Sequence, residues 1–508
     1  MRLRVFASLL ALVLLASCTS NADPARSPAP ALSGQPAAAP AMGTNGAAVP
    51  VLNWAPCKGK FQCARADVPV SYREPAGAKL ALSVIKLPAS DPAHRIGSLF
   101  FNFGGPGTGG VGELARFADR YPDELRARFD LVSFDPRGIG GSTAISCPGA
   151  DTLPGRGSPL RPEQRDAFYA ASAAAGKACA AGSPALLPHL SSANVARDLE
   201  LLRQSVGDKA LNFYGYSYGT YLGATYANLF PGTVRAITMD GTLDLVANAT
   251  GAPGQQDEPV DVRADVARGQ QQELDAFFDA CVKAGPKCAF SAGDPRQKFA
   301  DIFAKLSQGP VGGVTLPSLL ETINRSLYQS ARWSKLAVTL NGLASAAQGA
   351  AATHPPMLDP YVATHSPGFL AVQCVDSDNP AEPAAYDRLA ASEVRRQPYF
   401  GASAVFNMAQ CIGWPARDQD RYLGPWNRPR ANPILIVNSR HDPATPLHDA
   451  QATARQLGDG RVLVVDGFGH TTLDVHSACA SAALTRYFVD LTTPTEGTVC
   501  APDFTPFP

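Results

Sequence analysis

The pentapeptide Gly215-Tyr216-Ser217-Tyr218-Gly219 decides the fold of this chain. An apolar run at 210–214 leads into it and a helix-compatible run at 220–228 follows, which predicts a strand, a tight turn and a helix with Ser217 at the apex. Because glycine has no Cβ, the flanking glycines allow a sharp turn that holds the serine in a strained conformation with its hydroxyl exposed. An ordinary strand-to-helix turn is the alternative for so short a pattern, and the rest of the chain must decide between them.

Apolar runs elsewhere in the chain are typical of buried parallel strands. A helical pattern at 193–206 separates two of them, with Val195, Leu199, Leu202 and Val206 at helical spacing. Strands that alternate with helices predict an α/β fold with a mostly parallel central sheet. The runs are 98–103, 131–134, 211–214, 236–239, 434–437 and 462–465.

The region between Asp240 and Pro433 lacks a comparable series of strands. Its patterns are helical, so we expect a largely helical cap inserted at 245–425. The insertion would divide the sheet domain into a first part at 51–244 and a second part at 426–508. The helical patterns cover 270–282, 298–306 and 335–352.

Length and charge set broad limits on the function. The 508 residues include 44 Lys and Arg and 44 Asp and Glu, so the formal net charge is zero. This balance gives no indication of a nucleic-acid partner or of a strongly acidic binding surface. No motif for a metal ion or an organic cofactor is visible, and the oligomeric state stays open.

The first residues, 1–18, are typical of an export signal rather than of the fold. Two arginines precede an apolar run that is too short to span a bilayer. The run ends in Leu15-Ala16-Ser17-Cys18, which resembles a bacterial lipobox and implies that Cys18 becomes lipidated and anchors an exported protein to a membrane, periplasmic or at the cell surface. The alternative is an ordinary secretory signal that is removed together with Cys18. Residues 19–50 are dominated by Ala, Pro, Ser and Gly and predict a flexible tether.

The chain has 11 cysteines, and lipidation of Cys18 would leave an even number. An exported chain folds in an oxidising compartment, so this even set indicates disulfides. The cysteines fall into neighbouring couples, and short loops close at low entropic cost. A metal site is the competing interpretation, but no C-x-x-C motif or histidine cluster accompanies them. We therefore predict the pairs Cys57–Cys63, Cys147–Cys179, Cys281–Cys288, Cys374–Cys411 and Cys479–Cys500.

A serine nucleophile needs a general base and an acid that orients the base. On this fold the acid follows a late strand and the histidine follows the last one. Asp442 comes after the run at 434–437, and His470 follows the run at 462–465 in a glycine-rich turn. We therefore expect Ser217, His470 and Asp442 to form a catalytic triad. His441, His448 and His476 are rival bases that we interpret as surface or packing residues, and Asp466 is a rival acid that belongs to the histidine loop itself.

The glycine-rich segment Gly104-Gly105-Pro106-Gly107 follows a predicted strand. Backbone N–H groups that point at a developing oxyanion stabilise it, and glycines let the backbone approach a substrate closely. We expect the oxyanion hole to use the N–H groups of Gly105 and Tyr218. The segment lacks the Lys and Ser/Thr of a phosphate-binding P-loop.

With these residues in hand, the chain resembles the tripeptidyl aminopeptidase and proline iminopeptidase branch of the α/β-hydrolases, and most closely the exported bacterial forms with a TAP-like C-terminal region. In that family the glycine-rich loop is often preceded by His, whereas Phe103 stands here. The resemblance extends from about Trp54 onward. The matching segments are 63–72, 104–107, 135–142, 215–223, 240–241, 442–446 and 469–470.

The resemblance implies hydrolysis of short peptides from a free amino terminus through an acyl-enzyme. Such specificity needs an anion to bind the substrate ammonium, and the candidates are Asp244, Asp376 and Asp378. A carboxylesterase with the same triad is the first rival function. A surface-tethered binding protein that keeps the hydrolase fold without turnover is the second.

Overall fold

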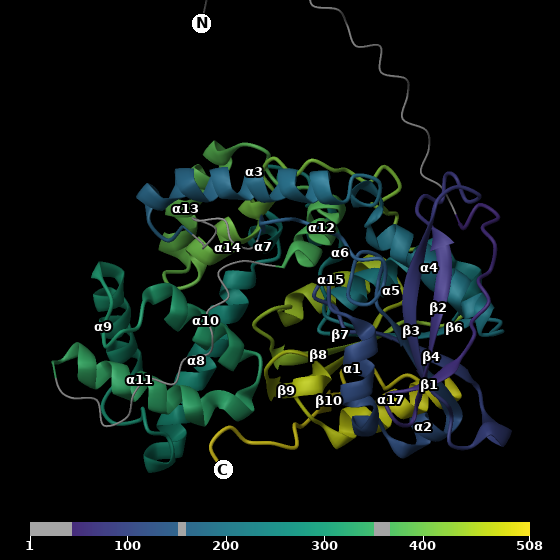
Figure 1. Ribbon diagram of the computed structural model, residues 1–508. Coiled ribbons are helices and arrows are strands. Elements are labelled where there is room, and N and C mark those ends of the chain that lie inside the picture. The colour runs from purple at the N-terminus through teal and green to yellow at the C-terminus, as the bar shows by residue number, and fades with distance from the viewer. Residues whose placement is uncertain (1–42, 151–158, 350–365) are drawn as a thin grey trace, which may run out of the picture. The chain divides into compact units, whose positions relative to one another are not determined.

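The computed structural model describes residues 43–150, 159–349 and 366–508 (Figure 1). Cys18, the expected signal at 1–18 and nearly all of the expected tether lie outside the described residues. No helix of the described part of the chain is both long enough and apolar enough to cross a membrane.

Ten strands of the described residues form one sheet in the order β1-β2-β3-β5-β4-β6-β7-β8-β9-β10. The pairs β1–β2, β2–β3 and β3–β5 are antiparallel, and every later pair is parallel. The mostly parallel sheet is therefore confirmed. The strands are Ala55–Cys57 (β1), Phe61–Pro69 (β2), Lys79–Leu87 (β3), Gly97–Asn102 (β4), Phe129–Phe134 (β5), Leu211–Tyr216 (β6), Val234–Asp240 (β7), Leu435–His441 (β8), Arg461–Phe468 (β9) and Val499–Cys500 (β10).

The six predicted strands correspond to β4 to β9. Strands β4 to β8 are mostly buried on both faces of the sheet, whereas β9 alternates buried residues with half-buried or exposed ones. Neighbouring side chains of a strand point to opposite faces, so Phe100 and Phe101 of β4 enter two different apolar clusters. Helices cover both faces. One face carries α4 (Ser192–Ser205), α5 (Tyr218–Leu229) and α15 (Leu447–Leu457), and the other carries α1 (Gly110–Phe117), α2 (Asp123–Arg128) and α17 (Ala478–Asp490).

The segment between β7 and β8 is helical, as predicted, and part of it has an apolar core of its own, which includes Phe277, Ile323 and Trp333. Its α-helices are Leu245–Ala249 (α6), Val260–Arg263 (α7), Val266–Ala284 (α8), Pro295–Gln308 (α9), Leu316–Leu327 (α10), Trp333–Ala347 (α11), Pro367–Asp376 (α12), Pro383–Arg396 (α13) and Gly401–Asn407 (α14). The 3-10 helices of the described chain are Pro92–His94, Ala118–Arg120, Pro162–Gln164, Leu187–His189, Pro231–Thr233, Gly285–Lys287, Ser330–Arg332 and Met408–Cys411 (η9).

One helix crosses the boundary that the sequence predicts between core and cap. Helix α3 (Arg165–Gly182) precedes the nucleophile in sequence, yet it lies beside α13 and α14 (Figure 1). Phe168 of α3 packs in one cluster with Tyr386 and Phe406 of the inserted segment. The group of helices α3, α13 and α14 is thus built from chain segments that precede and follow Ser217.

The structure joins the ten remaining cysteines into five disulfides, and the pairing follows the neighbouring couples of the sequence. Each disulfide closes a loop in which the two cysteines are between 6 and 37 residues apart. The pairs are Cys57–Cys63, Cys147–Cys179, Cys281–Cys288, Cys374–Cys411 and Cys479–Cys500.

Candidate active site

Ser217 occupies the turn between β6 and α5. Its backbone angles are φ 53° and ψ −124°, a conformation that costs free energy for a residue with a Cβ. The turn is tight enough that a Cβ at Gly215 would lie 2.3 Å from the carbonyl oxygen of Gly219. The glycines of the pentapeptide are therefore required by sterics, and the strained serine that the sequence predicts is present.

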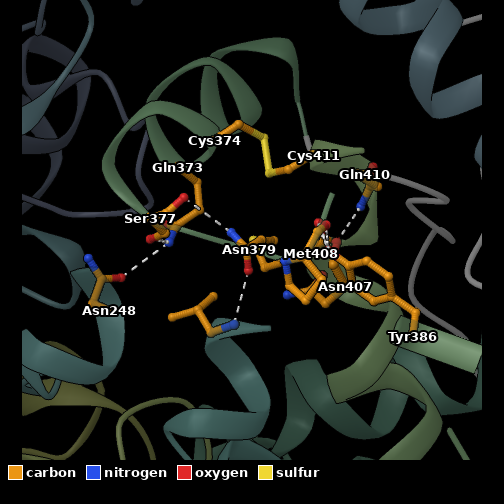
Figure 2. Close-up of a disulfide and its surroundings, with 12 residues drawn as sticks. Asn248, Gln373, Cys374, Ser377, Asn379, Tyr386, Asn407, Met408, Gln410 and Cys411 are labelled. Atoms are coloured by element: carbon orange, nitrogen blue, oxygen red, sulfur yellow. Dashed lines mark hydrogen bonds between the residues drawn. A yellow bond between two sulfur atoms is a disulfide. The ribbon is translucent and has the colours of Figure 1, made fainter. Parts of the chain in front are cut away.

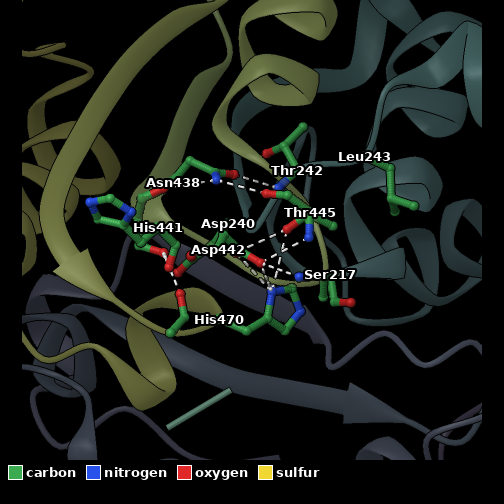
Figure 3. Close-up of polar contacts among 12 residues, drawn as sticks. Ser217, Asp240, Thr242, Leu243, Asn438, His441, Asp442, Thr445 and His470 are labelled. Carbon is green, nitrogen blue, oxygen red and sulfur yellow. Dashed lines mark hydrogen bonds and ion pairs between the residues drawn. The ribbon is translucent and has the colours of Figure 1, made fainter. Parts of the chain in front are cut away.

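Asp442 and His470 meet at the carboxyl edge of the sheet, because β8 and β9 are adjacent parallel strands. His470 Nδ1 lies 2.9 Å from Asp442 Oδ1 and 2.8 Å from Oδ2 (Figure 3). Both residues are buried. An ion-paired, buried contact of this kind holds the imidazole ring in one orientation.

Asp442 is itself held by its own loop. The N–H groups of Ala444 and Thr445 donate to Asp442 Oδ1 at 2.9 and 2.8 Å. Thr445 Oγ1 donates to Asp442 Oδ2 at 3.0 Å and lies 3.3 Å from His470 Nδ1 (Figure 3). Burial lowers the pKa of His470, but the charge of Asp442 and its hydrogen bond outweigh this effect, so the pKa lies above its ordinary value.

The other ring nitrogen, His470 Nε2, is buried and has no hydrogen-bond partner among the described residues. His470 and Ser217 line the same cavity, and the stick view places their side chains next to each other (Figure 3). Contacts between nucleophile and base are often loose without substrate. Tyr328, which follows α10, fixes the loop because its carbonyl accepts the His470 N–H at 3.0 Å and its ring packs edge-on to the imidazole.

The glycine-rich loop lies against the nucleophile turn. A Cβ at Gly104 would lie 2.5 Å from the carbonyl oxygen of Tyr216 and 2.9 Å from the nitrogen of Tyr218, so only glycine permits this approach. Gly105 follows with φ 104° and lines the same cavities as Ser217. The Tyr218 N–H is the first of α5 and has no acceptor within its own helix. Both expected oxyanion donors thus belong to segments that surround the serine.

The rival residues have other contacts. The His441 ring stacks on Phe468, and burial lowers the pKa of His441. His448 Nε2 lies 3.2 Å from the carbonyl oxygen of Ala264. The remaining two rivals are Asp466, which pairs with Arg440, and His476, which lines the cavity of His470 without contacting Asp442.

Two cavities open at Ser217. The first, of about 410 Å³, is lined by Ser217 and by helices of the inserted segment, and its acidic residues are Asp261, Glu321 and Asp449. We call it the acidic cavity. The second, of about 670 Å³, is lined by Ser217, His470 and residues around α1. We call it the histidine cavity. Gly105 and Tyr328 line both cavities.

The three acids expected to bind a substrate amine line neither cavity. Asp244 caps α6, where it accepts the N–H groups of residues 246 and 247. Asp376 is 1% exposed and accepts hydrogen bonds from Ser192 N and Tyr218 Oη. Asp378 forms a 2.7 Å ion pair with Arg421. All three carboxylates already form hydrogen bonds or an ion pair within the fold. We therefore withdraw the role in binding a substrate amine that we expected of them from sequence.

Asp261 of α7, by contrast, lies at a cavity that opens at Ser217. It lines the acidic cavity, and among the described residues it has no ion pair, whereas Glu321 is paired with Arg325 at 2.6 Å. Asn407 donates a hydrogen bond to Asp261 Oδ2. Burial raises the pKa of Asp261 to about 6. No motif marks this residue, and only the packing of α7 against α14 brings it to the cavity.

A second acceptor lies close by on η9. Gln410 lines the acidic cavity, and its Nε2–H donates a hydrogen bond to the carbonyl oxygen of Asn407 at 3.1 Å (Figure 2). Its buried Oε1 has no partner among the described residues. The disulfide Cys374–Cys411 holds η9 against α12, whose Gln373 also lines the cavity (Figure 2). Asp261 and Gln410 therefore offer acceptor oxygens in the acidic cavity.

The strand order, the strained serine turn and the Asp442–His470 pair define an α/β-hydrolase fold. Comparison with known families agrees, because residues 99–278 match the model of the alpha/beta hydrolase fold and residues 397–500 match that of the TAP-like protein. The chain belongs to the α/β-hydrolase family and carries the TAP-like region at its C-terminal end.

Curated relatives cover most of the chain. The tripeptidyl aminopeptidase of Streptomyces lividans is 29% identical over 488 residues, which are 90% of this chain and 88% of that protein. The serine protease Hip1 of Mycobacterium tuberculosis is 29% identical over 504 residues, 88% of this chain and 91% of that protein. Carboxylesterase B of the same species is 30% identical over 479 residues, 87% of this chain and 86% of that protein.

Proposed function

We propose that this protein is a serine exopeptidase that releases short peptides from free amino termini. The observation that carries the proposal is the acidic cavity, which begins at Ser217 and contains Asp261, a carboxylate without an ion-pair partner among the described residues. A substrate ammonium bound there would place a peptide bond further along the substrate at the serine. Relatives named tripeptidyl aminopeptidase and serine protease support a peptide substrate.

The proposed reaction uses the residues at the sheet edge. Ser217 Oγ bonds to the substrate carbonyl carbon while His470 Nε2 takes the hydroxyl proton, and Asp442 orients the imidazole and stabilises its charge. The N–H groups of Gly105 and Tyr218 bind the oxyanion. Cleavage of the C–N bond transfers the proton from His470 to the leaving nitrogen. Water then attacks the acyl ester, with His470 again as base, and releases the short peptide and free Ser217.

The ammonium site would combine charge and hydrogen bonding. Asp261 supplies the negative charge and Gln410 Oε1 a neutral acceptor, while Asn407 contacts both residues and orients them. An ammonium has several donors, so it suits a site with more than one acceptor. A cavity of about 410 Å³ admits only a short segment of peptide, which would limit how many residues are released.

Peptide arylamides test this proposal. We expect the wild type to hydrolyse amino-terminally free tripeptide arylamides and to be at least tenfold slower on blocked ones, because one charge-assisted contact is worth about 1.5–3 kcal/mol. Ser217→Ala should leave a folded protein with less than about a thousandth of the activity. Asp261→Asn should raise KM for the free substrates, whereas Asp257→Asn, an exposed acid of the same segment, should not. Equal rates on free and blocked substrates would exclude an exopeptidase.

A carboxylesterase is the second candidate, and the similarity to carboxylesterase B favours it. An ester leaving group needs less protonation than an amine, so the same triad would serve. A comparison of kcat/KM on a tripeptide arylamide and on a short acyl ester distinguishes the two functions. A large preference for the ester, with no dependence on a free amine, would favour the esterase.

We further propose that the protein is exported and anchored through a lipid on Cys18. The five disulfides support folding outside a reducing cytosol. Metabolic labelling with an alkyne fatty acid should mark the wild type and not Cys18→Ser. A mature protein that lacks Cys18 by mass spectrometry would instead indicate an ordinary secretory signal.

A further inference from the structure

The position of His470 decides on which side of Ser217 the leaving group departs. In the proposed reaction, on which this inference rests, His470 Nε2 gives its proton to the leaving nitrogen, so that nitrogen must come within hydrogen-bond reach of it. His470 lines the histidine cavity and is not among the residues around the acidic cavity. The leaving segment of the peptide therefore extends into the histidine cavity.

The wall of this cavity combines aromatic rings with two cations. The Phe103 ring stacks with the rings of Phe117 and Tyr216, whose centroids lie 6.0 and 5.7 Å away. The guanidinium carbons of Arg116 and Arg120 lie 4.8 and 4.9 Å from the centroid of the Phe117 ring. Stacking on an aromatic ring is a favourable contact that holds a guanidinium in place.

Most hydrogen-bond donors of these arginines are unused. The side-chain contacts of Arg116 within the described chain, besides its ring contact, are limited to Glu113 Oε2 at 3.9 Å, and its side chain is 67% exposed. Arg120 donates once, from Nη1 to the carbonyl oxygen of Leu473 at 3.3 Å. A guanidinium has five N–H donors in a planar fork that matches a carboxylate. Both arginines can therefore bind an anionic ligand and keep their present contacts.

Two acids also line the cavity and must be compared with the arginines. Glu113 lies one helical turn from Arg116 and contacts it at the long distance given above, so their mutual attraction through solvent is weak. Asp474 accepts a hydrogen bond from Gln329 Nε2 at 2.8 Å, and burial raises its pKa. Both acids thus also attract the arginines, Glu113 through Arg116 and Asp474 through the charge of Arg120. The side chain of Arg116 is 67% exposed and that of Glu113 29%, so the more exposed charge on α1 is positive.

We propose that Arg116 and Arg120 form a carboxylate-binding subsite for the leaving segment of the substrate. The substrates that it favours are short peptides that carry a carboxylate close behind the cleaved bond. This carboxylate is either the free C-terminus of the peptide or an acidic side chain.

Peptides that share the same three amino-terminal residues and differ in the leaving segment test the subsite. The leaving segments are a neutral arylamide, Ala-Ala with a free C-terminus, Ala-Ala amide and Asp-Ala amide. We expect kcat/KM to be about tenfold higher for the free acid than for the amide, and the Asp-Ala amide shows whether a side-chain carboxylate serves as well. Equal kcat/KM values for all three peptides would overturn the subsite.

Variants provide a second readout that does not depend on the absolute rate. Arg116→Gln/Arg120→Gln should reduce the ratio of acid to amide kcat/KM to about one, and Arg116→Glu should invert it. Glu113→Gln should raise the ratio because it removes the competing acid. The control Arg461→Gln removes an exposed charge at the start of β9 and should keep the wild-type ratio. An unchanged ratio in the arginine variants would overturn the assignment.

The arylamide separates this inference from the proposed function. If wild-type protein fails to hydrolyse the free tripeptide arylamide, the exopeptidase itself is refuted, and the subsite with it. If it hydrolyses the arylamide but gives equal kcat/KM for the free acid, the Ala-Ala amide and the Asp-Ala amide, the exopeptidase stands and the carboxylate subsite is refuted.

Discussion

Tyr218 Oη donates a 2.7 Å hydrogen bond to Asp376 Oδ2, and this buried contact joins the residue after the nucleophile to the end of α12. The same carboxylate accepts the N–H of Ser192 at the start of α4. Asp376 thus connects the inserted segment, the nucleophile turn and a helix of the core. Burial raises its pKa to about 6. We expect this contact to couple the packing of α12 to the geometry of the oxyanion site.

Removal of the Tyr218 hydroxyl should therefore destabilise the fold. We expect Tyr218→Phe to lower the free energy of unfolding by about 1–3 kcal/mol, because the buried Asp376 Oδ2 loses one of its two hydrogen-bond donors and keeps the Ser192 N–H. Urea unfolding measures the change. Tyr399→Phe is the matched control, since no hydrogen bond of the Tyr399 hydroxyl is found among the described residues. Equal losses in both variants would show that the Asp376 contact contributes nothing.

Thr445 should matter for catalysis through Asp442. Thr445→Val removes the hydroxyl that donates to Asp442 Oδ2. A hydrogen bond to a charged group is worth about 1.5–3 kcal/mol, so we expect kcat to fall about 10- to 100-fold. Thr445→Ser keeps the hydroxyl and should retain most of the activity. Stopped assays on a tripeptide arylamide compare the variants, and equal rates for Val and Ser would contradict the role.

The acid limb of the pH profile of kcat/KM should have its midpoint above pH 6.5, the ordinary pKa of histidine. His470 must be neutral to accept the serine proton, and its raised pKa keeps it protonated to a higher pH, so kcat/KM falls as the pH decreases through that value. The charge of Asp474 contributes to the rise. Asp474→Asn should therefore move the limb to lower pH, while Asp466→Asn, at an exposed ion pair, should leave it in place.

Asp261 should add a pH dependence that only substrates with a free amine show. Its pKa of about 6 means that it loses its charge as the pH falls through that value. We expect KM for amino-terminally free arylamides to rise below about pH 6, and KM for blocked ones to stay constant. The KM of Asp261→Asn should be high and independent of pH. A KM that rises equally for both substrates would assign the effect to another group.

The disulfide Cys374–Cys411 should support the acidic cavity. It closes a loop with a sequence separation of 37 and joins α12 to η9, both of which line the cavity. Loop entropy predicts a loss of up to about 4 kcal/mol on its removal. Cys374→Ser/Cys411→Ser should also raise KM for amino-terminally free tripeptides. The control Cys57→Ser/Cys63→Ser removes a short loop whose cysteines do not line the acidic cavity and should leave KM unchanged.

Glu273 of α8 should lower the free energy of unfolding at high pH. Both of its carboxyl oxygens are buried and have no hydrogen-bond partner among the described residues, and burial, with Asp442 nearby, raises its pKa. The folded protein holds this proton where the unfolded chain releases it, so stability falls as the pH rises above the ordinary pKa of glutamate. Glu273→Met should gain about 1–3 kcal/mol at pH 8 and less at pH 5 in urea unfolding.

The sequence identified those strands and helices whose pattern is formed by residues that are adjacent in the chain. The strands buried on both faces are continuous apolar runs, so the run at 98–103 corresponds to β4, Gly97–Asn102. Strand β2, Phe61–Pro69, escaped this search because it alternates buried residues with exposed ones such as Arg65. Helix α3 was assigned to the core because its place in the chain says nothing about which layer it packs against.

The sequence alone determined the α/β-hydrolase class and the candidate residues Ser217, Asp442 and His470, because each follows a strand whose carboxyl end must lie at one edge of a parallel sheet. Only the tertiary structure decided which acids face a ligand. Asp376 looked available and is enclosed by Ser192 and Tyr218, whereas Asp261, which no motif marks, opens on the acidic cavity. The physical reason is that a carboxylate binds a ligand only when the packed fold leaves it unpaired, and packing depends on segments far apart in the chain.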